Sequence, residues 1–151
     1  MKTILEIENY KLDDLPLIAE KLSAAIPDSG VVAFHGDMGV GKTTLIKQLC
    51  VSLGVVDRVS SPTFGLVNVY HRKNGTVINH IDLYRLENES EAEGAGIFDL
   101  FNNPGLSLVE WPERIANYLP LDSLIVKVSV SVNDGVRDGA DNSGSLVFQT
   151  Q

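Results

Sequence analysis

The sequence has little cysteine and lacks long apolar runs. Its 151 residues include one cysteine, Cys50, which excludes a disulfide within the chain and agrees with a reducing cytosol. No apolar run approaches the roughly 20 residues that a membrane-spanning helix needs. Acidic residues interrupt the first apolar positions, so we expect no secretion signal there. We therefore expect a cytoplasmic protein with no membrane partner.

Basic residues are also scarce. The chain carries 12 lysines and arginines against 20 aspartates and glutamates, for a net charge of −8. Because nucleic-acid binding over a broad surface needs clustered bases to neutralise phosphates, this composition argues against it. A role in a nucleic-acid pathway stays open, through a protein complex that itself holds the RNA.

The length and the pattern of apolar residues predict one α/β domain over residues 1–151. Period-2 and compact apolar runs predict strands at 4–7, 31–35, 66–70, 76–81, 106–110, 124–132 and 146–148. Helical spacing predicts helices over 15–22, 42–53, 89–95 and 113–119. We expect the P-loop NTPase fold, in which helices flank a mixed, mostly parallel central sheet with added β-hairpins.

A phosphate-binding pattern follows the second predicted strand. The segment Gly36-Asp37-Met38-Gly39-Val40-Gly41-Lys42-Thr43 matches the P-loop pattern in full. Its glycines allow backbone N–H groups to surround phosphate oxygens, and the next helix points its positive N-terminus at the same anion. Lys42, expected at the surface, would contact the β- and γ-phosphates of ATP, and the Thr43 hydroxyl would bind Mg²⁺. A chance match is the alternative, which the flanking strand and helix disfavour.

Two acids stand where a P-loop protein places its second Mg²⁺ anchor. Asp82 follows the apolar run 77–81, and Glu110 follows the run 106–109. An acid at the C-terminal end of a neighbouring strand can hold the ion or orient the attacking water. Spacing alone leaves open which acid touches the metal, and either one alone could be a capping or solvated carboxylate.

The loop Ser61-Pro62-Thr63-Phe64 lies between the P-loop helix and the predicted hairpin. Switch loops of nucleotide hydrolases occupy this place in the chain, where a threonine hydroxyl can reach the γ-phosphate side of the ion. Ser-Pro-Thr by itself is usually just a turn. Thr63 is therefore a candidate switch residue.

Four motifs together resemble the TsaE (YjeE) family. They are the P-loop extended to Thr44, the segment 61–64, His80-Ile81-Asp82-Leu83-Tyr84-Arg85, and Glu110-Trp111-Pro112-Glu113. The P-loop is generic, whereas the other three in this order are specific to the family. The resemblance extends from about residue 31 to residue 119.

The resemblance implies an ATPase that supports threonylcarbamoylation of adenosine 37 in ANN-decoding tRNAs. In this family the protein acts on a complex of TsaD and TsaB, so it meets tRNA only indirectly. Its cofactors are ATP and Mg²⁺. The resemblance implies that Thr43 and Glu110 hold the metal and that residues 36–44 hold the phosphates. It makes Asp82, Thr63 and Lys42 the catalytic candidates, and it places Trp111 beside the nucleotide.

Other nucleotide-dependent functions fit the residues less well. A small-molecule or nucleotide kinase usually carries an arginine-bearing lid, but the five arginines are scattered at positions 58, 72, 85, 114 and 137. A regulatory GTPase needs an Asn-Lys-x-Asp motif to recognise guanine, and the sequence contains none. The kinase remains the main alternative to the partner-dependent ATPase.

Overall fold

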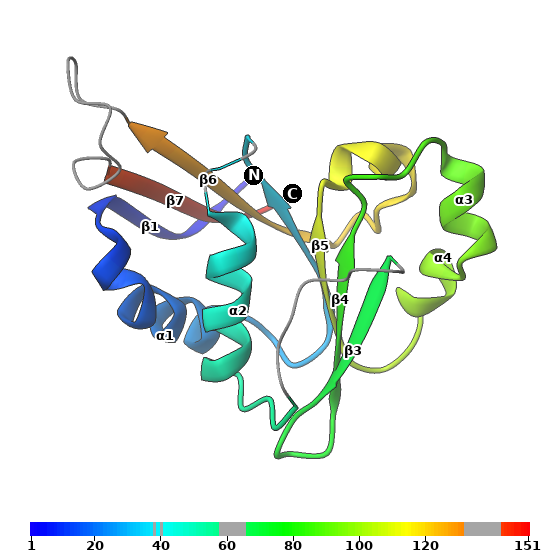
Figure 1. Cartoon of the computed structure of the whole chain (residues 1–151), viewed down its shortest axis with the longest axis horizontal. Helices are drawn as coiled ribbons and strands as arrows, with labels where there is room; N and C mark the ends of the chain where they lie inside the picture. Colours follow the sequence, from blue (N-terminus) through cyan, green and yellow to red (C-terminus); the bar gives the residue numbers. More distant parts are fainter. Residues whose placement is uncertain (38, 40, 58–65, 132–142) are drawn as a thin grey trace.

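The computed structural model describes residues 1–37, 39, 41–57, 66–131 and 143–151. Its centre is a seven-stranded sheet with the strand order β1-β7-β6-β2-β5-β4-β3 (Figure 1). The strands are β1 (Thr3–Tyr10), β2 (Gly30–His35), β3 (Val67–His71), β4 (Val77–Asp82), β5 (Leu106–Glu110), β6 (Leu124–Ser131) and β7 (Ser143–Thr150). All seven predicted strands are therefore confirmed, several of them longer than expected.

Parallel pairing is confined to the four central strands. β2 pairs in parallel with both β5 and β6, and β5 pairs in parallel with β4. β3 runs antiparallel to β4, and β7 runs antiparallel to both β6 and β1. The prediction of a mixed sheet with added hairpins is confirmed. The expectation of a mostly parallel sheet holds only for its centre, because the outer strands pair antiparallel.

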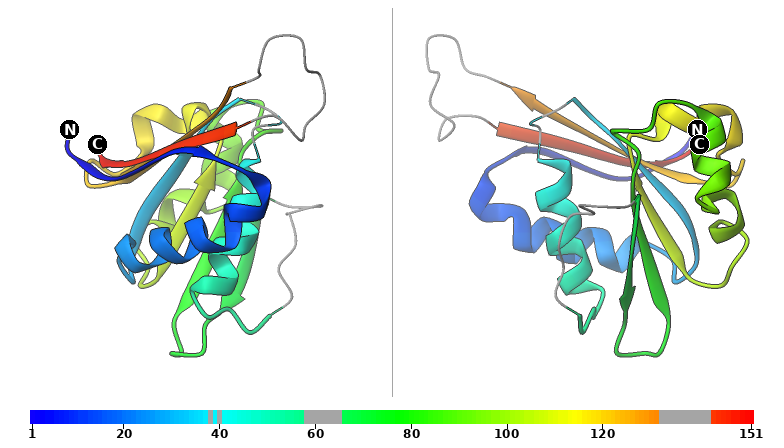
Figure 2. Two further views of the ribbon diagram at one scale, coloured as in Figure 1. Left: turned by 90° about the vertical axis from the view of Figure 1, so that its left-hand side faces the viewer. Right: turned by 45° about the vertical axis from the view of Figure 1, so that its right-hand side comes forward.

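Helices cover both faces of this sheet (Figures 1 and 2). One face carries α1 (Leu15–Ala25), preceded by the short η1 (Leu12–Asp14), and α2 (Lys42–Ser52). The other carries α3 (Glu89–Gly94), α4 (Ile97–Leu100) and η2 (Pro112–Tyr118). Alternation along β2 separates the two cores, because Val32 and Phe34 pack with α1 and α2 whereas Val31 packs on the opposite side.

The helices agree with the sequence except near residues 97–119. The segment after Pro112 is a 3₁₀ helix, not an α-helix, and Ile115 interrupts it with non-helical backbone angles (φ −132°, ψ 33°). The single turn α4 was not predicted, because four residues offer too little periodicity. In the described part of the chain, no helix is long and apolar enough to cross a membrane.

Candidate functional site

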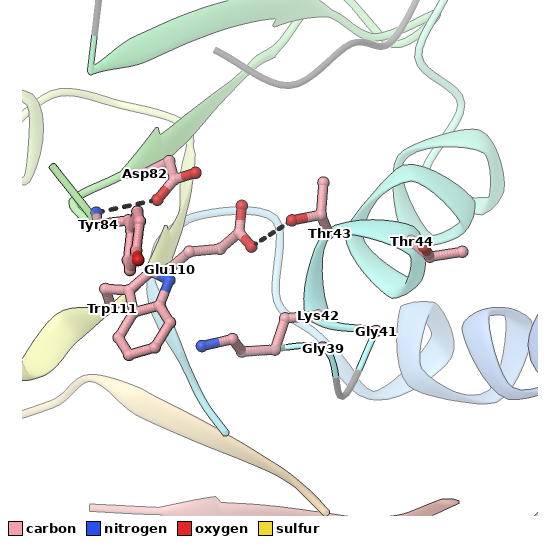
Figure 3. A pocket seen from close by; sticks show the side chains of 9 residues that line it. All are labelled: Gly39, Gly41, Lys42, Thr43, Thr44, Asp82, Tyr84, Glu110 and Trp111. Carbon is pink, nitrogen blue, oxygen red and sulfur yellow. Dashed lines mark hydrogen bonds between the residues drawn. The ribbon is translucent and has the colours of Figure 1, made fainter. Parts of the chain in front are cut away.

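A cavity of about 410 Å³ opens at the C-terminal ends of β2, β4 and β5, where α2 begins (Figure 3). In parallel α/β sheets this edge is where ligands bind, because loops and helix N-termini converge there. Residues from three separate parts of the chain line it: Gly39, Gly41, Lys42, Thr43, Thr44, Asp82, Tyr84, Glu110 and Trp111. The fold thus brings together the P-loop and both acids predicted from the sequence.

The loop between β2 and α2 requires glycine at two positions. Gly39 and Gly41 have φ of +83° and +90°, a region that side-chain-bearing residues rarely adopt. Among the described residues, a Cβ at either position would meet no atom within 4 Å, so the backbone conformation is what favours glycine. Gly41 directly precedes α2, whose free N–H groups face the cavity edge. Met38 and Val40, also predicted to bind phosphate, lie outside the described residues.

Lys42 is buried, contrary to the expectation that it would lie at the surface. Only 5% of the residue is exposed. Its Nζ donates a hydrogen bond to the Gly36 carbonyl and lies 3.6 Å from the centroid of the Trp111 ring. The indole covers the ammonium group, a contact between residues far apart in sequence. Burial lowers the pKa of Lys42, against the opposing effect of nearby carboxylates, of which Glu113 is the strongest.

Glu110 is held by two donors. Its carboxylate is 2% exposed, and Oε1 accepts a hydrogen bond of 2.7 Å from the Thr43 hydroxyl. Oε2 lies 2.8 Å from His80 Nε2. Burial would raise the pKa of Glu110, but the hydrogen bonds from His80 and Thr43 outweigh it, so the pKa lies below its ordinary value. The site therefore keeps this carboxylate ionised.

Asp82 lies beside Glu110 but in a different environment. The two residues are register partners on β4 and β5. Oδ1 of Asp82 accepts a hydrogen bond of 3.0 Å from the Tyr84 backbone N–H. Burial raises the pKa of Asp82, the Tyr84 hydrogen bond opposes this, and the charge of Glu110 adds to the rise. Two adjacent acids thus have pKa values displaced in opposite directions, a pattern found at functional sites.

Two further residues of the site had no role predicted from the sequence. His80 is fully buried on β4 and contacts Glu110. Tyr84 lines the cavity, and its ring centroid lies 5.1 Å from that of Trp111. The segment His80-Ile81-Asp82-Leu83-Tyr84-Arg85, one of the motifs of the family resemblance, contains both residues, but only Asp82 received a role from it. Thr63, the predicted switch residue, lies outside the described residues, as does the whole segment 58–65.

Comparison with known proteins gives a consistent result. The family described as threonylcarbamoyl adenosine biosynthesis protein TsaE matches residues 10–138. Two relatives named tRNA threonylcarbamoyladenosine biosynthesis protein TsaE come from Bacillus subtilis and Rickettsia bellii. The Bacillus subtilis protein is 37% identical, and the match covers 76% of this chain and 71% of that protein. The Rickettsia bellii protein is 31% identical, and the match covers 88% of this chain and 89% of that protein.

A third relative of that name, from Haemophilus influenzae, is 40% identical over 65% of this chain, and the match spans 61% of its own length. The crystal structure of YdiB from Bacillus subtilis superposes with a TM-score of 0.70 at 24% identity, covering 100% of this chain and 88% of that one. This likeness concerns the fold. From the family match and these identities, the chain belongs to the TsaE family of tRNA threonylcarbamoyladenosine biosynthesis proteins.

Proposed function

We propose that this protein is a Mg²⁺-dependent P-loop ATPase that supports tRNA threonylcarbamoylation by acting on the TsaB–TsaD complex. The observation that carries the proposal is the hydrogen bond of 2.7 Å between the Thr43 hydroxyl and the Glu110 carboxylate. It joins the first turn of α2 to the end of β5 beside Lys42, at the edge of a parallel sheet. This is the arrangement by which P-loop proteins hold Mg²⁺ next to phosphates.

The residues present fit a magnesium ion. Thr43 and Glu110 offer a hydroxyl and a carboxylate, and Mg²⁺ prefers such oxygen ligands. Within the described residues, no group of three or more His, Cys, Asp or Glu side chains could hold a metal by itself. Mg²⁺ at nucleotide sites commonly takes only one or two protein oxygens beside substrate phosphates. Bound there, it would neutralise charge on the β- and γ-phosphate oxygens.

The residues also fit a triphosphate. α2 is 11 residues long, and its N-terminus carries partial positive charge toward the cavity. Lys42 lies at the same edge of the sheet. Its Nζ donates a hydrogen bond to the Gly36 carbonyl and makes a cation–π contact with the Trp111 ring. A phosphate oxygen is a stronger partner for an ammonium ion than either, so we expect Lys42 to move from Gly36 and Trp111 onto the nucleotide.

Asp82 is the acid that we propose for the attacking water. Thr43 and His80 already engage the Glu110 carboxylate. The Asp82 carboxylate accepts a hydrogen bond from the Tyr84 backbone N–H and lines the open cavity. Its raised pKa makes it the better proton acceptor of the two. Asp82 would therefore orient water, and Glu110 with Thr43 would hold the ion.

The composition of the chain supports coupling to a protein partner, for which we propose TsaB–TsaD. Its net charge of −8 suits a protein partner better than direct binding to tRNA. ATP hydrolysis can change a partner only if the ATP and ADP states bind that partner with different free energies. The segment containing Thr63, next to α2 in the chain, is the transmitter that we propose.

Phosphate release with and without TsaB–TsaD tests this function. We expect slow, Mg²⁺-dependent hydrolysis by the protein alone and stimulation by the complex. Thr63→Ala should reduce the stimulation more than it reduces ATP binding. Equal rates with and without the complex would contradict the partner role. Phosphoryl transfer to an acceptor in a screen of small molecules would instead favour a kinase.

A further inference from the structure

A second layer of polar residues lies behind the proposed metal site. His80 and Glu110 are both buried, at 0% and 2% exposure, and His80 Nε2 lies 2.8 Å from Glu110 Oε2. The other oxygen, Oε1, accepts from Thr43. Donors from β4 and from α2 therefore hold the two carboxylate oxygens separately. With both oxygens held, the plane of the carboxylate is fixed.

Two polar side chains of β3 lie behind His80. Asn68 Nδ2 donates to the Tyr70 hydroxyl at 3.3 Å, and that hydroxyl lies 3.4 Å from His80 Nδ1. An ionised carboxylate only accepts hydrogen bonds, so the contact of 2.8 Å to Glu110 requires a proton on His80 Nε2, which His80 donates.

We infer that His80 is a positioning residue that orients the Glu110 carboxylate for the metal ion, an inference that rests on the proposed function. His80 does not line the cavity, so it acts through Glu110. Without the Nε2 donor, Oε2 would be a buried carboxylate oxygen with one partner fewer, and the carboxylate could rotate away from Thr43. Hydrogen-bond partners of metal ligands typically change metal affinity or activity by about 10–100-fold when removed.

Two substitutions of similar size separate positioning from simple core packing. In His80→Gln the side-chain amide nitrogen can reach the place of Nε2. In His80→Asn the amide ends near the place of Nδ1, and the donor to Glu110 is lost. A residue that merely filled space would respond similarly to both changes.

The measurement is the Mg²⁺ concentration that gives half-maximal ATP binding, followed by the fluorescence of Trp111, the one tryptophan in the sequence. We expect His80→Asn to raise this concentration by about 10–100-fold and His80→Gln to stay within about threefold of wild type. His71→Asn is the control, because His71 is 66% exposed and pairs with Asp57 on the surface. It should leave the Mg²⁺ dependence unchanged.

A measurement on the unmodified protein keeps the inference testable if a variant fails to fold. The chain has three histidines, so nitrogen-15 NMR of the imidazoles is simple to assign. Nε2 of His80 should carry a proton. An Nε2 without a proton could not donate to Glu110 and would overturn the inference without any substitution.

The outcomes distinguish the two proposals. If the wild type binds ATP with Mg²⁺ dependence and His80→Asn matches it, the positioning role is wrong and the proposed function stands. If both His80 variants raise the Mg²⁺ concentration for half-maximal ATP binding equally, the positioning role is also wrong, because the donor at Nε2 then makes no difference. If the wild type binds no ATP, the proposed function fails and takes the positioning role with it.

Discussion

Replacing Thr43 by valine tests the geometry of the site in the protein without nucleotide. The substitution keeps the branched shape and removes the hydroxyl that donates to Glu110 at 2.7 Å. Hydrogen bonds to charged groups contribute roughly 1.5–3 kcal/mol to stability. Glu110 is buried but Thr43 is only half-buried, so solvent can partly replace the lost donor. We expect a destabilisation near the lower end, about 1.5–2 kcal/mol.

For a chain of this length, 1 kcal/mol shifts Tm by about 2–4 °C. Thr43→Val should therefore lower Tm by about 3–8 °C near neutral pH. The direction in which this stabilisation changes with pH follows from the pKa of Glu110. Because its pKa is lowered in the folded protein, its stabilisation is present above its unfolded pKa and is lost as pH falls through the folded value. The difference between Thr43→Val and wild type should shrink over the same acidic range.

Urea unfolding followed by circular dichroism, in the absence of ATP and Mg²⁺, measures the loss of unfolding free energy in Thr43→Val. Thr43→Ser keeps the hydroxyl and is the matched control. A double-mutant cycle with Glu110→Gln isolates the pairwise energy. If Thr43→Val and Thr43→Ser unfold at the same urea concentration, the hydrogen bond from Thr43 to Glu110 does not stabilise the fold.

Three further substitutions or treatments have distinct expected outcomes. Lys42→Met should weaken ATP binding by about tenfold to a hundredfold, because one or two charge-assisted hydrogen bonds are lost. If calorimetry gave an unchanged affinity for ATP, Lys42 would not bind phosphate. Asp82→Asn should slow hydrolysis while ATP stays bound. Asp82→Asn should also raise the free energy of unfolding near neutral pH, because burial raises the pKa of Asp82 and disfavours its charged form. This gain should vanish in acid. A lower free energy of unfolding at neutral pH, measured with urea, would contradict the prediction. Cys50 is fully buried, and burial raises its pKa to about 12. Thiol reagents at pH 8 should therefore label Cys50 only after unfolding. Rapid labelling of the native protein would show that α2 does not bury Cys50.

Local sequence indicated most of the helices and strands and the glycine-containing loop before α2. The apolar run 31–34 forms most of β2, which begins at Gly30 and ends at His35, just before Gly36. The helical spacing of Leu45, Ile46 and Leu49 placed α2, and all three are buried as expected. The motifs beyond the P-loop also indicated the family, which the comparisons confirm. The strand, the helix and each single motif depend on residues close together in the chain, whereas the family assignment also uses the order of the motifs.

Tertiary structure alone decided how the site is built. Spacing left Asp82 and Glu110 equivalent, and the structure separates them because only Glu110 meets both Thr43 and His80. Lys42 is buried because the Trp111 ring covers it. β7 enters the sheet between β1 and β6, which no local pattern indicated.

The physical reason is the range of the interactions. Periodicity and turn chemistry act over a few residues, so sequence carries them directly. Thr43 and Glu110 are 67 positions apart, and His80 and Glu110 are 30 apart. Their contacts depend on strand order and register, which the packing of the whole sheet fixes. The chain supplied the functional groups, and the fold determined which of them face one another.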